Sequence, residues 1–273
     1  MGLPSEIGGG GAAGLIRSRA SFNPRYPRPM HCWVYGSLSG YIADLATGTR
    51  PGTITGTVTQ SHRGFEIADG TAGNCIKISN FTQQPSDGPE SGYCTLLHVF
   101  TPLSLSGSAT RHVLEVSDGD KDNAPFLTME RTSAGVVRWI CPDGAYNNWA
   151  GLLVAEETAA VIFRWRDLTN GSQTRWDGFF KREKNGVTGT DSTLVFDRIN
   201  FGTGFFGDMH CRHHFSVVWN EPLWDADCYD LCESPWWVFA PEPVMSLGTA
   251  IASALRIPRL PSQPKIPSVG WPG

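Results

Sequence analysis

The side chains with the most potential for chemistry gather late in the chain. They are of the types that bind zinc in proteins: Asp208, His210, Cys211, His213, His214, Cys228 and Cys232. In an extended strand, His210 and His214 would share one face, and Cys211 and His213 would share the other. No zinc-finger or zinc-protease spacing is present. We therefore interpret this group as ordinary core and surface residues, and we expect no metal and no cofactor.

Two further motifs match ligand-binding patterns only in part. Residues 117–123 (SDGDKDN) place Asp118, Asp120 and Asp122 at alternating positions, but the twelve-residue calcium loop needs a glycine at its sixth position, which is missing here. Residues 202–207 match GxGxxG, yet they lead into an extended run instead of the helix that a dinucleotide site requires. Both segments are better explained as turns.

Signatures of catalysis are weak. A glycosidase on a sandwich would use two carboxylates across a cleft, whereas the adjacent Glu156 and Glu157 would point to opposite faces of a strand. Residues 36–40 have Leu38 where a nucleophilic serine would stand. The sequence therefore predicts that the chain is not an enzyme, and a polysaccharide-cleaving activity is the least favoured hypothesis.

Aromatic residues around the loop 142–148 indicate a different kind of site. Sugar-binding sites combine exposed rings with polar groups, and the candidates here are Trp139, Tyr146 and Trp149. The simpler interpretation of most tryptophans is that they lie in the core. Both interpretations stay open at this point.

The composition bounds the fold and the class of protein. The chain has 273 residues, 40% hydrophobic and 18% charged, with 31 glycines, which favours many strands and turns. A net charge of −4 argues against nucleic-acid binding by bulk charge. Seven cysteines in apolar settings suggest buried free thiols, and no stretch approaches 18 apolar residues, so we expect no membrane span and no signal peptide.

The expected elements are mostly short strands separated by turn residues. Residues 93–101 are predicted as a central strand, and Phe215, Val217 and Trp219 as the buried face of a late strand. Residues 223–233 are predicted as a short helix, followed by aromatic residues that cap the core. The Asn185-Gly186 pair predicts a tight hairpin turn. This spacing without intervening helices indicates an antiparallel sandwich.

Both ends of the chain read as extended arms. We expect an N-terminal arm over 1–30, a sandwich over 31–240 and a proline-rich C-terminal arm over 241–273. The arms carry excess basic charge on an otherwise acidic chain, which suits contacts with neighbouring proteins. The predicted partner-binding residues are Phe22, Arg25, Tyr26, Arg28, Leu247, Ile251, Leu255, Arg256 and Arg259.

Residues 31–239 resemble the concanavalin A-like, laminin-G-type jelly-roll domains of tailed-bacteriophage virion proteins. The segments that carry the resemblance are 32–34 (CWV), 44–48 (DLATG), 93–102 (YCTLLHVFTP), 205–208 (FFGD), 218–220 (VWN) and 234–239 (SPWWVF). The last is similar to an Asn-Pro-Trp-x-x-Phe ending of such domains, although Ser234 replaces the asparagine. The calcium-binding acids of the family are not clearly placed.

The resemblance implies a structural virion protein made in the cytoplasm of a bacterial host. The favoured hypothesis is a head decoration or head-fibre subunit that binds capsid or other virion proteins through its arms. A homo-oligomer is expected, with a trimer preferred. The alternative is a carbohydrate-binding adhesion module of a tail or fibre, which would recognise a glycan on the host surface.

Overall fold

A computed structural model describes eleven segments of the chain: residues 22–35, 42–48, 50–68, 73–79, 93–105, 109–117, 127–141, 145–168, 173–189, 198–202 and 207–239. Contacts divide the chain into residues 1–240 and 241–273, and every described residue belongs to the first unit. The predicted arm residues Leu247, Ile251, Leu255, Arg256 and Arg259 lie outside the described segments. The domain boundaries expected from sequence stay a prediction.

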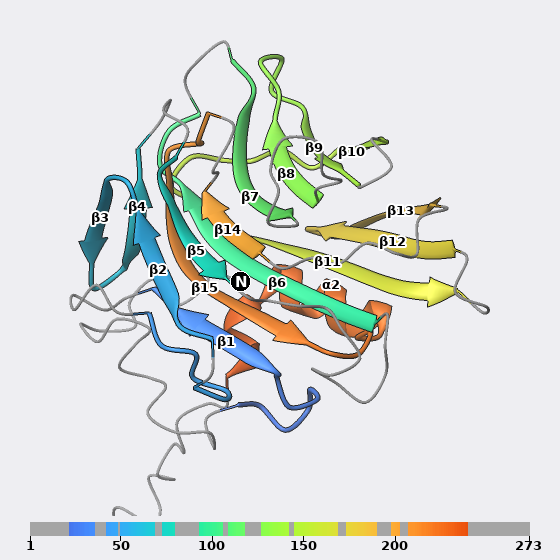
Figure 1. The fold of residues 1–273 in the computed structure, drawn as a ribbon. Coiled ribbons are helices and arrows are strands. Elements are labelled where there is room, and N and C mark those ends of the chain that lie inside the picture. Colours follow the sequence, from blue (N-terminus) through green and yellow to red (C-terminus); the bar gives the residue numbers. More distant parts are fainter. Residues whose placement is uncertain are drawn as a thin grey trace, which may run out of the picture. The chain divides into compact units, whose positions relative to one another are not determined.

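Two antiparallel sheets form the described part of the chain (Figure 1). The eight-stranded sheet has the order β13 (Glu183–Gly189), β12 (Gln173–Phe180), β11 (Ala159–Leu168), β6 (Tyr93–Pro102), β15 (Cys211–Trp219), β4 (Gly64–Ile67) and β3 (Val58–Ser61), and β1 (His31–Val34) also pairs with β15. The seven-stranded sheet has the order β10 (Tyr146–Trp149), β9 (Val137–Ile140), β8 (Leu127–Arg131), β7 (Arg111–Ser117), β14 (Arg198–Gly202), β5 (Cys75–Ser79) and β2 (Gly52–Thr55). The expected all-β sandwich is confirmed.

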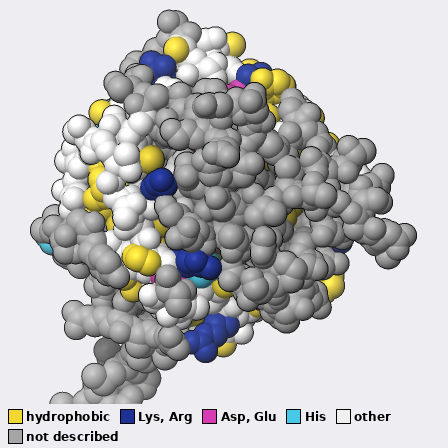
Figure 2. Space-filling model, viewed as in Figure 1, with side chains coloured by type: hydrophobic (Ala, Val, Ile, Leu, Met, Phe, Trp, Pro, Cys, Tyr) yellow, Lys and Arg dark blue, Asp and Glu magenta, His cyan; other side chains and the backbone are white. Residues whose placement is uncertain are grey.

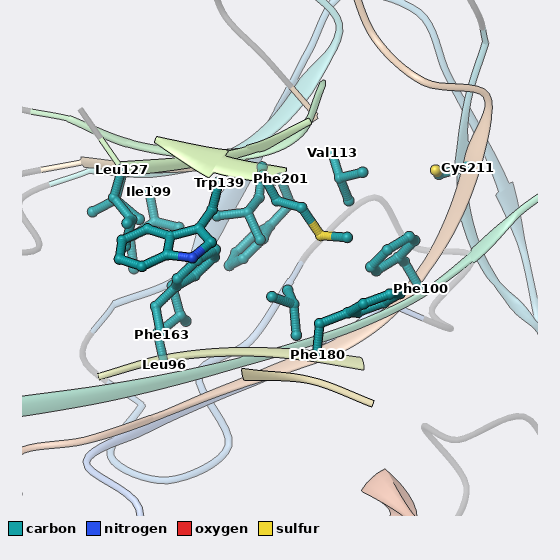
Figure 3. Close-up of a cluster of buried hydrophobic side chains, with 14 of the residues drawn as sticks. Leu96, Phe100, Val113, Leu127, Trp139, Phe163, Phe180, Ile199, Phe201 and Cys211 are labelled. Carbon is teal, nitrogen blue, oxygen red and sulfur yellow. The ribbon is translucent and has the colours of Figure 1, made fainter. Parts of the chain in front are cut away.

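The main core lies between the two sheets. Figure 3 shows Trp139, Leu127 and Ile199 reaching from one layer toward Phe163 and Phe100 on the other. All five side chains are at most 1% exposed. Because successive strand residues point to opposite faces, the residues between these positions must face away from this core.

A second apolar cluster covers the other face of the eight-stranded sheet. Helix α2 (Asp225–Glu233) packs against β11 and β12 (Figure 1). The short 3-10 helix η3 (Pro235–Val238) follows α2 directly. The buried members of this cluster include Leu97, Ile162, Phe215, Val217, Trp219, Cys228, Leu231 and Phe239.

The eight-stranded sheet is therefore buried on both faces. Ser216 and Val218, which alternate with Phe215, Val217 and Trp219, have no exposed surface either. The prediction of one buried face for this strand is corrected, because α2 and η3 cover the side that would otherwise meet solvent. Double burial also explains the continuous apolar run of β6.

The hairpin between β12 and β13 differs from the sequence prediction. Asn185 and Gly186 lie inside β13, paired with Gly178 and Asp177, and the turn is at residues 181–182. A Cβ atom at position 186 would lie 2.1 Å from the Arg175 guanidinium. The glycine is therefore explained by close side-chain packing across the strands and not by turn geometry.

On the face drawn in Figure 2, the lysine and arginine side chains stand apart from one another. No helix among the described residues is long and apolar enough to cross a membrane.

Candidate functional site

The predicted histidine and cysteine group is split between the two faces of β15. A bulge between His213 and Phe215 turns His213 toward the main core, while His214 bonds Thr101 (Nε2 to Oγ1, 2.8 Å) and the carbonyl of Arg63. Cys228 and Cys232 lie in α2, in the second cluster. Within the described segments, no three His, Cys, Asp or Glu side chains are grouped to hold a metal ion.

His213 ends a buried polar chain inside the main core. The hydroxyl of Tyr35 donates to Ser216 (2.9 Å), Ser216 Oγ lies 2.8 Å from Nδ1 of His98, and Nε2 of His98 lies 3.0 Å from Nδ1 of His213. Burial lowers the pKa of His213 to about 3 and that of His98 well below its usual value. These groups stabilise the interior and are not accessible to a substrate.

The cysteines are free thiols, as the sequence suggests. All seven are buried, and burial raises the pKa of Cys75 to about 11 and that of Cys228 to about 12. Thiols with such pKa values carry little thiolate at neutral pH and are poor nucleophiles.

The three aromatic candidates have different positions. Trp139 is fully buried and Trp149 is 2% exposed, with both rings in the main core. Tyr146 is 58% exposed. Of the three rings, only Tyr146 is placed to contact a ligand.

Tyr146 stands on the outer face of the seven-stranded sheet, next to Arg138 and Asn148. In the β9–β10 ladder, Tyr146 pairs with Ile140 and Asn148 pairs with Arg138. The alternating residues Trp139 and Trp149 point into the core, so Arg138, Tyr146 and Asn148 point outward. The Arg138 guanidinium carbon lies 4.1 Å from the centroid of the Tyr146 ring, and Asn148 is exposed. We call these three residues the Tyr146 platform.

A buried polar chain on the same face holds Arg138 in place. Its Nε donates to Oε1 of Glu130, which is 2% exposed, and Oε2 of Glu130 lies 3.4 Å from Nε2 of His112. Nδ1 of His112 lies 3.2 Å from Oγ1 of Thr128, whose hydroxyl donates to the carbonyl of Leu114. Burial and the nearby charges of Arg138 and Arg111 lower the pKa of His112 to about 4, which keeps this ring neutral at pH 7.

The polar row continues across the sheet toward its centre. Thr128 pairs with Glu115, Glu115 with Asn200, and Asn200 with Lys77. Glu115, Thr128 and Asn200 are each at most 4% exposed. The outer face of this sheet thus carries a row of polar groups from edge strand β10 to β5. The row is buried at Glu115, Thr128 and Asn200 and exposed at its β10 end, around Tyr146.

The predicted arm residues that the structure describes contact their own chain. Phe22 forms a bridge with Phe239, Arg25 pairs with Asp227 and Asp230, and Tyr26 is 5% exposed in the second cluster. Arg28 is exposed. Contact of these residues with a partner protein stays a prediction.

The remaining sequence candidates contribute no described site. Asp118, Asp120 and Asp122 and most of the GxGxxG segment lie outside the described residues. Glu156 and Glu157 are exposed in the loop after β10, with Glu156 at a φ of 64°.

Arg138, Glu130 and Asn148 were not identified from the sequence. Glu130 lies in β8, Arg138 in β9 and Asn148 in β10. The missing information was the pairing of β9 with β10, which sets Arg138 beside Tyr146. A weak signal was present, because period-two alternation puts residues 138 and 140 on the face opposite Trp139.

The comparisons with known proteins found similar folds only. No protein-family model and no curated protein sequence matches the chain. Trypanosoma rangeli sialidase in complex with 2,3-difluoro-KDN matches with a TM-score of 0.59 at 13% identity, over 77% of this chain and 33% of the sialidase chain. The same sialidase in complex with sialic acid matches with a TM-score of 0.59 at 11% identity, over 78% of this chain and 33% of that chain. The binding domain of botulinum neurotoxin serotype D matches with a TM-score of 0.52 at 9% identity, over 76% of this chain and 51% of that chain.

These likenesses show a shared β-sandwich fold. The chain spans about a third of the length of the sialidase chains. The expectation that the chain is not an enzyme is contradicted, because chains of enzymes share its fold. The missing acid pair in the sequence therefore does not exclude catalysis.

None of the reported structures links the chain to a bacteriophage. Capsid partners, a trimer and placement in the virion stay predictions that no observation tests.

Proposed function

We propose that this chain binds carbohydrate through the Tyr146 platform. The observation that carries the proposal is the exposed Tyr146 ring with the Arg138 guanidinium 4.1 Å from its centroid. An exposed ring offers its apolar face to the C–H surface of a sugar, while neighbouring polar groups bond to the hydroxyls. The amide of Asn148, exposed on the same face, supplies both a donor and an acceptor.

The buried groups below the platform fit a binding role. Glu130 is held between Arg138 and His112, so the Arg138 side chain is positioned before a ligand arrives. Preorganisation of this kind lowers the entropy cost of binding. The fold likeness adds support, since the similar structures include a sialidase in complex with sialic acid and a toxin domain described as a binding domain.

A glycan array followed by calorimetry on the best ligand tests the proposal. Tyr146→Ala should weaken binding at least about tenfold, because a central aromatic contact is lost. Trp224→Ala is the matched control, since Trp224 is 81% exposed, lies outside the platform and makes no side-chain capping hydrogen bond to α2. An array without ligands, or equal loss in both variants, would show that the platform is not a sugar site.

A further inference from the structure

We infer that the Tyr146 platform selects sugars that carry a carboxylate, through the unfilled hydrogen-bond donors of Arg138. This inference rests on the proposed carbohydrate binding and adds the chemical class of the ligand. The inference depends on the hydrogen bonds, the exposure and the neighbours of the Arg138 guanidinium.

The guanidinium of Arg138 is only partly used by its own protein. A guanidinium has five N–H donors, and Nε of Arg138 is bonded to Glu130. Among the described residues, neither Nη1 nor Nη2 of Arg138 has a hydrogen-bond partner. Four N–H donors therefore remain without a partner among the described residues, and their planar arrangement matches the two oxygens of a carboxylate.

The exposure of the two charges favours an anionic ligand at this edge. The side chain of Arg138 is 26% exposed, whereas the side chain of Glu130 is 3% exposed beneath it. A ligand approaching from solvent therefore reaches the cation first. His112 stays neutral at pH 7, so the positive charge that contacts Glu130 directly is that of Arg138.

Tyr146 leaves room for the body of the sugar beside the guanidinium. Arg138 covers one part of the ring, and 58% of the residue surface remains exposed. A carboxylated sugar would place its charged group at the Nη edge of Arg138 and its C–H surface on the open part of the ring. A neutral sugar would fill only the second position and leave the Nη donors to water.

Calorimetry with matched ligand pairs tests this inference on the full chain. The pairs are sialyllactose against lactose, and a glucuronic-acid-terminated against a glucose-terminated oligosaccharide. We expect at least one acidic ligand to bind about tenfold or more tightly than its neutral partner, since a charge-assisted bidentate contact is gained. The preference should shrink between 50 and 500 mM salt, concentrations chosen because screening is strong at the higher value.

Two substitutions separate charge from geometry. Arg138→Gln removes the charge, and Arg138→Lys keeps it but loses the planar fork, so both should reduce the acidic preference, the glutamine variant more strongly. Loss of the Arg138 charge leaves the buried Glu130 carboxylate beside a neutral His112, which can destabilise the protein, so folding is checked by circular dichroism. Where Arg138→Gln fails to fold, the ligand pairs and Arg138→Lys decide.

The outcomes distinguish this inference from the proposed function. Equal binding of acidic and neutral sugars that Tyr146→Ala abolishes overturns the carboxylate inference and leaves the carbohydrate function standing. An acidic preference that survives both Arg138 variants also overturns the inference. No binding of any sugar contradicts the proposed function itself.

Discussion

Nε2 of His98 lies 3.0 Å from Nδ1 of His213, and both imidazole rings are buried between the two sheets. A hydrogen bond between two imidazoles needs one N–H donor and one lone pair, so at least one of the rings must be neutral. Burial disfavours the charged form of either ring. The folded core therefore favours the neutral form of His98 and His213, and protonation of these rings would destabilise it.

The stability of the protein should fall as the pH falls below about 6.5. Four buried histidines have lowered pKa values in the folded state: His98 well below the usual value, His213 about 3, and His112 and His214 about 4. In the unfolded chain these rings take up protons near pH 6.5. Between pH 6.5 and about 4 the unfolded state thus binds more protons, which costs about 1.4 kcal/mol per pH unit for each ring.

Urea unfolding at pH 7.5, 6.5, 5.5 and 5.0 measures this dependence. Asp44, whose pKa is lowered to about 2, adds a further loss of stability only below about pH 4, the usual pKa range of its carboxyl. A constant free energy of unfolding from pH 7.5 to 5.0 would contradict the prediction.

Tyr26 should contribute through its ring and not through its hydroxyl. The ring is buried in the second cluster, and the flanking backbone is fixed by bonds from Trp219 Nε1 to the Pro27 carbonyl (2.9 Å) and from the Asn23 amide to the Val238 carbonyl (3.0 Å). Tyr26 Oη is buried and has no hydrogen-bond partner in the part of the chain that the structure describes. Tyr26→Ala should cost about 3 kcal/mol, whereas Tyr26→Phe should cost nothing or stabilise slightly.

Denaturant unfolding of the two Tyr26 variants checks this expectation. A large loss in Tyr26→Phe would mean that the hydroxyl makes a bond in solution. An unchanged midpoint in Tyr26→Ala would show that residues near 26 do not stay packed on the sandwich.

Two ion pairs that involve α2 should differ strongly in their effect on stability. Arg164 is 7% exposed, and its Nη2 lies 2.6 Å from Asp177 and 2.7 Å from Asp225 at the start of α2. Arg182 meets Glu233 at the far end of the helix, where both side chains are exposed. Arg164→Leu should cost about 3 kcal/mol, because the buried Asp177 loses its closest cation.

Arg182→Leu is the matched control for Arg164→Leu. An exposed pair contributes little after screening, so this variant should leave the urea midpoint unchanged. Equal midpoints for the two variants would show that burial of Arg164 does not set its contribution.

The elements that sequence predicts well are those bounded by strong local signals. β6 is an apolar run between turn residues, and the helix expected over 223–233 is observed at Asp225–Glu233. Pro235 follows this helix and fixes its end. Trp236 and Phe239 pack on Phe215, as the expected capping of the core requires.

The candidate site is not predictable in the same way, because it depends on contacts between strands. Alternation alone places Tyr146 and Trp149 on opposite faces of a strand, but it does not say which face is covered. That choice follows from the second sheet, which buries Trp149 against Phe163 and Phe180. The turn predicted at Asn185-Gly186 is wrong for a related reason. Position 186 lacks space for a side chain because Arg175 on the next strand packs against it.

Gly178 should be intolerant of any side chain, because two tryptophans fill the space beside it. A Cβ atom at position 178 would lie 2.7 Å from Trp139 Nε1 and 2.9 Å from the Trp149 ring, and Trp149 Nε1 donates to the Gly178 carbonyl (3.4 Å). Overpacking of this kind costs about 1–3 kcal/mol, so Gly178→Ala should lower the free energy of unfolding by that amount. The near-ultraviolet circular dichroism of the tryptophans should change as well, while Leu152→Ala, at a 62% exposed position, should change neither quantity. A Gly178→Ala protein with native stability and an unchanged spectrum would contradict the close packing of Trp139 and Trp149 against Gly178.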